Sequence, residues 1–383
     1  MTRTASALVR SATLICALAG AVVLAGCAQG SAGSSSPGAA PSVSATPTAA
    51  NLALDCGRLL PVDRAATALG LPANSLFDPT SRDDAEQQPS SGAVQIIMQD
   101  AAAVLGGLVD CSYSAPDNGT GALTDDGSRM LPRVNVRVLR NAGDEFTAGE
   151  PDSDDGLRGL HPVDLGATAY VACHPPEHDS CRAEILVGTT WVNATVSPQP
   201  TEESFVAFAR TVVAAVEAAG SAQATTAPRL VGCDALLAPA DLADAVAIDA
   251  ARPTDYGSPD WGEIGVWPAA QRGAGLLSCG WSSSGSGATS GGVLVNILPG
   301  AAAVWNATPP NSANSSIHFE AVTGLGDEAF AGCGGDSCEV DVLSGDVWVL
   351  VRYTSGHDGN LPDELPGAKT LAATALANYL TNR

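Results

Sequence analysis

The sequence predicts an α+β protein built from two tandem homologous domains, each an antiparallel sheet with helices packed on one face and pinned by disulfides. Three observations predict this class. Five motifs occur twice in the same order, apolar and polar residues alternate in several short stretches, and each copy contains four cysteines. Alternation with a period of two indicates strands, and runs of strands bounded by helices are typical of α+β layers.

The chain begins with the pattern of a signal peptide. Arg3 and Arg10 precede an apolar run that is too short and too rich in glycine for a comfortable membrane span. The run ends in Leu24-Ala25-Gly26-Cys27, which resembles the lipobox of bacterial lipoproteins. We therefore expect Cys27 to carry lipid, with palmitate among its acyl chains, and to hold the protein on the outer face of the cell membrane. An ordinary secretory leader with a coincidental cysteine is the alternative.

The segment after Cys27 is rich in Ser, Ala, Pro, Gly and Thr and contains neither charged nor aromatic residues. Such a composition predicts a disordered tether, with a reach of about 25–30 Å for a flexible chain. The predicted organisation is a signal peptide at 1–26, a lipidated cysteine and tether at 27–50, a first repeat at 51–220, a linker at 221–229 and a second repeat at 230–383.

The chain is strongly acidic. It contains 41 Asp and Glu residues against 18 Lys and Arg residues, and two of these basic residues lie in the leader. This charge disfavours nucleic acid and anionic lipid headgroups as non-covalent partners. Solubility is the simplest explanation of the acidity, and binding of a cationic ligand or partner is the alternative.

The cysteines indicate an oxidising compartment. Apart from Cys16 in the leader and Cys27, eight remain, and an even set outside the cytoplasm is typical of a disulfide framework. If pairing stays within a repeat, three patterns are open for each. Hairpin spacing favours two close pairs, which leaves two long ones. The expected bridges are Cys173–Cys181, Cys333–Cys338, Cys56–Cys111 and Cys233–Cys279.

Each repeat is expected to contain a helix, two strands, a three-strand meander and a terminal helix. The opening motif Cys-x-x-Leu-Leu, at Cys56 and Cys233, precedes short helices predicted over 62–69 and 240–246. Two strands follow. The first contains Cys111 or Cys279 after a matched block with paired alanines, and the second spans 134–139 or 293–298. The first terminal helix is indicated by an apolar stripe, begins after Thr201 and ends at Gly220; Leu371, Ala375 and Tyr379 mark its counterpart.

The meander is the most similar part of the two copies. In each, the second cysteine of a close pair is followed by Gly and Trp at the same spacing, Cys181 to Trp191 and Cys338 to Trp348. The first copy also has His174 and His178 between its cysteines, which would suit a zinc site. The second copy has no histidine there. We therefore expect a disulfide and no metal, with a weak surface metal site on the two histidines as the alternative.

The Cys-x-x-Leu-Leu opening, the later Cys279-Gly-Trp281 and Cys111-Ser-Tyr113 and the lipobox resemble the actinobacterial lipoproteins built on small domains of unknown function. More distantly, the chain is similar to the extracellular sensor domains of envelope receptor kinases. The resemblance implies a membrane-anchored binding or sensing module and brings no catalytic residues with it. Tyr113 departs from the usual Trp, so the first copy is the less typical one.

Catalytic and cofactor motifs are not found. The Gly-x-Ser-x-Gly motif of a nucleophile elbow does not occur, and no motif links His161, His318 or His357 to a nucleophile. The acidic stretch from Asp152 to Asp155 lacks the Glu that completes a hand-type calcium loop, so we expect a solvated loop. The sequence therefore predicts a non-enzymatic protein without cofactors, and an envelope hydrolase whose site is assembled only in space is an alternative.

One loop is a candidate ligand site. It contains three aromatic residues and two carboxylates, and the first repeat has nothing equivalent: Tyr256, Asp260, Trp261, Glu263 and Trp267. These residue types suit a sugar or a cationic amine. Packing of the aromatic rings on a small core is the alternative. We expect a binding, sensing or scaffolding module whose ligand is a small molecule or an envelope protein, and a lipid or small-solute carrier would instead require an apolar cavity.

Overall fold

The described part of the chain is discontinuous. The computed structural model describes residues 54–77, 93–116, 122–123, 129–148, 160–173, 180–198, 200–220, 231–248, 253–256, 265–283, 291–313, 316–355 and 363–383. By its contacts the chain divides into two units, Met1–Thr48 and Ala49–Arg383, and all described residues lie in the second. Cys27 lies outside them. Within the described ranges, no helix has the length and hydropathy needed to cross a membrane.

The first half of the described chain, residues 54–220, forms one six-stranded antiparallel sheet in the order β1-β4-β8-β7-β6-β5. A two-stranded ribbon of β2 and β3 is separate from it. The elements are α1 (Cys56–Leu59), α2 (Val62–Leu69), η1 (Ala73–Ser75), α3 (Ala93–Leu105), β1 (Val109–Ser114), β2 (Ala122–Leu123), β3 (Arg129–Met130), β4 (Arg133–Leu139), α4 (Gly143–Ala148), β5 (His161–Pro162), β6 (Thr168–Cys173), β7 (Cys181–Val187), β8 (Thr190–Ser197) and α5 (Glu202–Ala219).

The second half, residues 231–383, forms a seven-stranded antiparallel sheet in the order β12-β13-β14-β15-β11-β10-β9. Read from the other edge, six of its strands repeat the order of the first sheet, and β9 is the addition. The elements are η3 (Cys233–Ala235), α6 (Pro239–Val246), β9 (Thr254–Asp255), α7 (Val266–Gly273), β10 (Leu277–Ser282), β11 (Gly292–Leu298), α8 (Ala302–Ala307), η5 (Pro310–Ser312), β12 (Glu320–Ala321), β13 (Glu328–Gly334), β14 (Ser337–Ser344), β15 (Val347–Thr354) and α9 (Leu365–Asn382).

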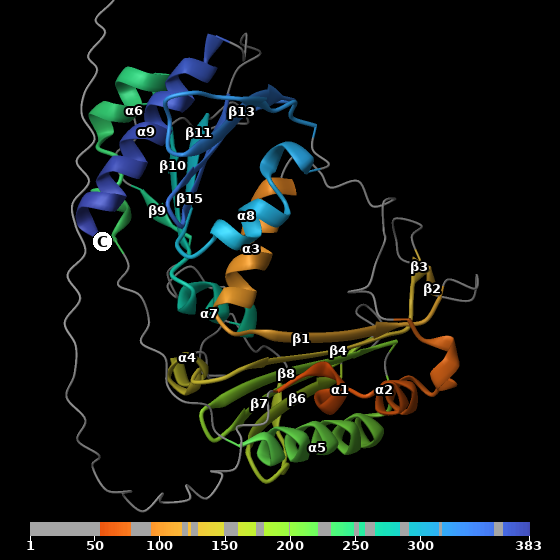
Figure 1. Ribbon diagram of the computed structural model, residues 1–383. Coiled ribbons are helices and arrows are strands. Elements are labelled where there is room, and N and C mark those ends of the chain that lie inside the picture. Colours follow the sequence, from red (N-terminus) through yellow and green to blue (C-terminus); the bar gives the residue numbers. More distant parts are fainter. Residues whose placement is uncertain are drawn as a thin grey trace, which may run out of the picture. The chain divides into compact units, whose positions relative to one another are not determined.

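The terminal helices follow from local sequence signals. The Thr201 side chain accepts a hydrogen bond from the Ser204 amide, which caps the start of α5, and Gly220 ends the helix. Four apolar residues at helical spacing are buried against the sheet: Phe205, Phe208, Val212 and Val216. Figure 1 shows α5 lying along one face of the first sheet, and α9 has the same position against the second sheet.

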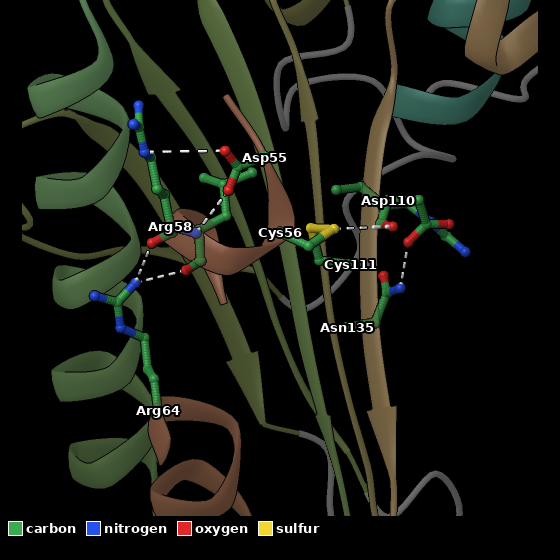
Figure 2. The surroundings of a disulfide bond; sticks show 9 residues. Asp55, Cys56, Arg58, Arg64, Asp110, Cys111 and Asn135 are labelled. Atoms are coloured by element: carbon green, nitrogen blue, oxygen red, sulfur yellow. Dashed lines mark hydrogen bonds and ion pairs between the residues drawn. A yellow bond between two sulfur atoms is a disulfide. The ribbon is translucent and has the colours of Figure 1, made fainter. Parts of the chain in front are cut away.

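All four expected disulfides are present. Cys56–Cys111 and Cys233–Cys279 join the opening motif of each half to β1 or β10, and the close pairs join β6 to β7 and β13 to β14. Figure 2 shows the Cys56–Cys111 bridge between α1 and the first sheet. The predicted α+β class with antiparallel, disulfide-pinned sheets is confirmed.

The structure adds a helix exchange that the sequence did not predict. The second face of each sheet packs against a helix from the other half. Val94 and Met98 of α3 pack with Trp305 and Trp348 of the second half. In return, Val266, Ala269 and Ala270 of α7 pack against residues of the first sheet and α4, including Trp191. Ala49–Arg383 is thus one compact unit by its contacts, and the domain boundary at 221–229 stays a prediction.

Candidate functional site

The structure describes two of the five residues of the predicted ligand loop. Tyr256 follows β9 directly, and Trp267 lies in the first turn of α7. Asp260, Trp261 and Glu263 lie outside the described residues.

Tyr256 is held over the second sheet by its backbone. Its amide donates a hydrogen bond to the Ser278 carbonyl at 2.9 Å, and β9 pairs with β10 just before it. The ring lies directly on Gly280, since a Cβ atom at that position would be 2.3 Å from the ring atom Cε2. Tyr256 is 45% exposed. The close approach of the ring therefore requires a glycine at position 280, since any Cβ atom there would collide with it.

A pocket of about 680 Å³ lies beside this ring. Its volume falls in the range of ~300–1,000 Å³ that is typical of small-molecule sites. The two helices exchanged between the halves form one wall, and strands β10, β11 and β15 form the floor. The lining residues are Gln95 and Gln99 of α3, Pro268, Gln271 and Arg272 of α7, and Tyr256, Leu276, Ser278, Gly280, Trp281, Ser282, Gly292, Val293, Leu294 and Thr354.

The described lining of the pocket contains a single charge, which is paired with a residue outside the lining. Its one charged side chain is Arg272, which forms an ion pair with Glu145 of α4 at 2.5 Å. The other polar side chains are Gln95, Gln99, Gln271, Ser278, Ser282 and Thr354, together with the hydroxyl-bearing Tyr256 and the indole-bearing Trp281. Together with one exposed aromatic ring, this lining suits an uncharged ligand with many hydroxyl or amide groups.

The glutamines of α3 are positioned by contacts to the second half. The Arg352 guanidinium donates a hydrogen bond to the Gln95 side chain at 2.9 Å. The side-chain amide of Gln271 donates a hydrogen bond to the backbone carbonyl of Gln99 at 3.2 Å, and this bond joins α7 to α3. The pocket wall therefore depends on the exchanged helices staying in place.

Two buried carboxylates, Glu339 and Asp341, lie beside Arg352 on the face of the second sheet that α3 covers. Arg352 pairs with Glu339, which is 1% exposed. The Trp348 indole donates to the Asp341 carboxylate at 2.9 Å. Burial raises the pKa of the Asp341 carboxyl well above its usual value, and the nearby Glu339 carboxylate raises it further. Burial also raises the pKa of Glu339, although Arg352 opposes that change.

Trp267 does not join Tyr256 in this site. Its ring lies under the Arg137 guanidinium, 5.1 Å from the ring centroid, and packs on the core between α7 and the first sheet. Trp267 does not line the pocket. Of the two described aromatics of the predicted cluster, Tyr256 lines a pocket and Trp267 packs on the core, as in the alternative interpretation of the cluster.

The remaining predicted features are mostly outside the described residues. They include His174, His178, His357 and the acidic stretch from Asp152 to Asp155. Among the residues that the structure describes, no group of three or more His, Cys, Asp or Glu side chains could hold a metal ion. His161 is described, and its imidazole lies 2.9 Å from the Glu202 carboxylate on the surface.

Most of the pocket residues could not be predicted from the sequence. Gln95, Gln99 and Gln271 carry no motif, and they meet the second sheet only through the helix exchange. Gly280 had a visible signal, because the first copy has Ser112 at the matched position. Comparison with protein-family models, with curated proteins and with solved structures finds no match for this chain.

Proposed function

We propose that this protein is a cell-envelope lipoprotein, anchored through Cys27, whose folded part is a non-enzymatic binding module. The pocket beside Tyr256 is the ligand site of this module. Its ligand is a neutral, hydroxyl-rich small molecule, such as a saccharide segment of the cell envelope. The observation that carries the proposal is the pocket of about 680 Å³, which has an exposed tyrosine, several amide and hydroxyl groups, and one described charge, on Arg272, that is paired with Glu145.

The extracytoplasmic location is supported by the four disulfides, since such bridges form and persist in oxidising compartments. The lipobox sequence supports the anchor. We expect Cys27→Ala to abolish acylation and membrane retention, as measured by mass spectrometry and by partition of the protein between membrane and soluble fractions. Retention of the Cys27→Ala protein in the membrane fraction would contradict the anchor.

The ligand class follows from the lining. Aromatic rings stack on the apolar faces of sugars, and amide and hydroxyl groups exchange hydrogen bonds with sugar hydroxyls. The pairing of Arg272 with Glu145 removes the one charge that would select an anion. The acidic composition would favour a cationic amine instead, so an amine is the competing ligand to be tested.

The test is isothermal titration calorimetry with chitotetraose and maltotetraose as neutral probes and spermidine as the cationic probe. We expect a neutral saccharide to bind, and Tyr256→Ala to weaken it by roughly threefold to tenfold through loss of ring stacking. Gly280→Ser should weaken binding similarly, because the new side chain displaces the ring.

Ser112→Gly is the matched control, since it changes the equivalent strand position in the first half. It should leave binding unchanged. Gly280→Ser should add little to Tyr256→Ala in the double variant, because both act through the same ring. Binding of spermidine alone, or saccharide binding that is insensitive to both variants, would contradict the proposed ligand class.

A further inference from the structure

A second pocket lies far along the chain from Tyr256, between α2 and α5 of the first half. It is an open groove of about 740 Å³. Its wall is formed mainly by apolar side chains, namely Ala68, Leu69, Pro198, Pro200, Ala207 and Phe208. Arg64, Thr67, Gly70, Ser204 and Thr211 complete the lining. Nothing in the proposed function of the Tyr256 pocket uses this groove.

The groove is not required by the fold, because the second half closes the same place. There, α6 and α9 are in direct contact at Gly367, where a Cβ atom would be 2.0 Å from the Ala245 carbonyl oxygen. Aligning the buried residues of α5 and α9 places Ser204 at the position of Gly367. Ser204 lines the groove. The first half therefore keeps its helices apart at the point where the second half joins them.

Arg64 supplies a fixed positive charge at this groove. Its Nη1 atom donates to the carbonyls of Arg58 and Leu59, at 3.2 and 2.5 Å, so the C-terminal end of α1 holds the guanidinium (Figure 2). Within the described part of the chain, no carboxylate lies within ion-pair distance of Arg64, and its Nε and Nη2 atoms donate no hydrogen bond. Burial lowers the pKa of Arg64, yet the group stays charged at neutral pH.

An arginine without an ion-pair partner among the described residues is unusual in a chain with more than twice as many acidic as basic residues. A half-buried guanidinium whose remaining donors have no described acceptor is satisfied best by a carboxylate or phosphate. The rest of the lining offers apolar surface, which favours a hydrocarbon chain. The acidic surface as a whole disfavours contact with an anionic bilayer. A single amphiphile taken from solution is therefore a better occupant of the groove than a lipid that stays in the bilayer.

We propose that the groove between α2 and α5 binds one long-chain fatty acid, with the carboxylate at Arg64 and the hydrocarbon chain along Leu69, Pro198 and Phe208. The binding step is non-covalent. The groove is thus a site for an amphiphile in the first half, independent of the site beside Tyr256.

The test is equilibrium dialysis of radiolabelled palmitate, below its micellar concentration, against the full chain carrying Cys27→Ala, so that no attached acyl chain competes. We expect palmitate to bind more tightly than laurate, by up to about fourfold for each additional buried methylene. Methyl palmitate should bind roughly tenfold more weakly than palmitate, because it lacks the charge. Arg64→Gln should remove this difference between the acid and its ester.

Ala207→Trp fills the groove from an exposed position on α5, and it should lower palmitate affinity at least tenfold. Thr370→Trp is its matched control, an exposed position one residue before Leu371 on α9, and should have no effect. Absence of palmitate binding, or equal binding by Ala207→Trp, would overturn the proposal. Binding to phosphatidylglycerol vesicles in place of free palmitate would overturn the choice of ligand. Tyr256→Ala should leave palmitate binding unchanged, which separates this result from the proposed saccharide site.

Discussion

In the second half of this protein α6 and α9 are in direct contact, whereas the first half has a groove between the matching helices α2 and α5. Gly367 brings α9 against α6 in one half, and Ser204 lines the open groove in the other. One fold therefore tolerates both arrangements. The difference is set by a few residues on the helices and not by the strands beneath them, which have the same order in both halves.

The opposite faces of the two sheets differ in a similar way. In the second half, Tyr256 lies on Gly280 beside a neutral pocket of about 680 Å³. In the first half, Ser112 replaces the glycine and accepts a hydrogen bond from Arg133. The neighbouring strand positions there line a pocket of only about 190 Å³, formed by Arg133, Asn135, Arg137, Thr195 and Ser197.

The halves agree in the parts that hold the fold together. Each has one long and one short disulfide. Each also has a buried tryptophan whose indole donates to a buried carboxylate on the neighbouring strand, Trp191 to Glu184 and Trp348 to Asp341. The common framework therefore serves stability, while the residues that differ form the candidate binding surfaces.

The largest effect is expected from the long disulfides. Replacing both Cys56 and Cys111 with Ala should lower the free energy of unfolding by about 4 kcal/mol, because the bridge closes a long loop in the unfolded chain. Replacing Cys233 and Cys279 should cost about the same. Removal of the short Cys333–Cys338 bridge should cost about 2 kcal/mol. Urea unfolding followed by tryptophan fluorescence measures all three, and unequal costs for the two long bridges would show that the halves do not share one framework.

The next effect concerns the exchanged helices. Met98 is fully buried on α3 against the second sheet, so Met98→Ala should cost about 3 kcal/mol, in the middle of the range for such cavities. Val104 lies on the same helix and is 70% exposed. Val104→Ala should change stability by less than about 0.5 kcal/mol. Equal effects of the two changes in urea unfolding would mean that α3 does not stabilise the second half.

The sequence predicted the elements whose signals are local. Val62–Leu69 was expected as a helix from its pattern, and the caps at Thr201 and Gly220 set the ends of α5 as expected. The disulfide pairing followed from the repeat and from hairpin spacing. All of these signals lie within one half and involve residues close to one another in the chain.

The exchanged helices could not be predicted in this way. α3 is apolar on most of its surface, so it shows no single stripe to mark it as an amphipathic helix. Its partners, such as Trp348, are about 250 residues away in the chain, and no short-range pattern encodes that contact. The pocket depends on this exchange, which is why Tyr256 was found from the sequence and Gln95 and Gln99 were not.

A smaller effect is expected where the helices meet in one half and not in the other. Gly367→Ala places a Cβ atom into the Ala245 carbonyl oxygen, and such overpacking should cost about 1–3 kcal/mol. Ser204→Ala is the matched change in the first half. It removes exposed hydrogen bonds between the Ser204 hydroxyl and Thr201 in the N-terminal cap, and alanine favours a helix, so it should cost less than about 1 kcal/mol. Thermal unfolding measures the pair, and a destabilisation by Ser204→Ala as large as that by Gly367→Ala would contradict the difference in helix packing.

The last comparison concerns the two buried carboxylates. Glu184 accepts hydrogen bonds from Trp191, Asn193 and Arg182, so Glu184→Gln leaves donors without acceptors and should cost about 1–3 kcal/mol at neutral pH. Asp341 accepts from Trp348, and its second oxygen has no partner among the described residues. Asp341→Asn keeps an acceptor for Trp348 and should therefore cost less.

The pH dependence of stability should separate the same two residues. The folded protein holds a proton on Asp341 above the pH at which the unfolded chain releases it, because the folded pKa is raised. Stability is therefore greatest below the ordinary pKa of 3.8 and falls as pH rises from there to the raised folded value. The loss is about 1.4 kcal/mol for each unit of pKa difference. Burial also raises the pKa of Glu184, but Arg182 opposes that change. Glu184 should therefore contribute less than Asp341 to the change of unfolding free energy with pH. Asp341→Asn should flatten the curve of unfolding free energy against pH more than Glu184→Gln does, and the reverse order would mean that the Arg182 pair does not offset burial in the first half.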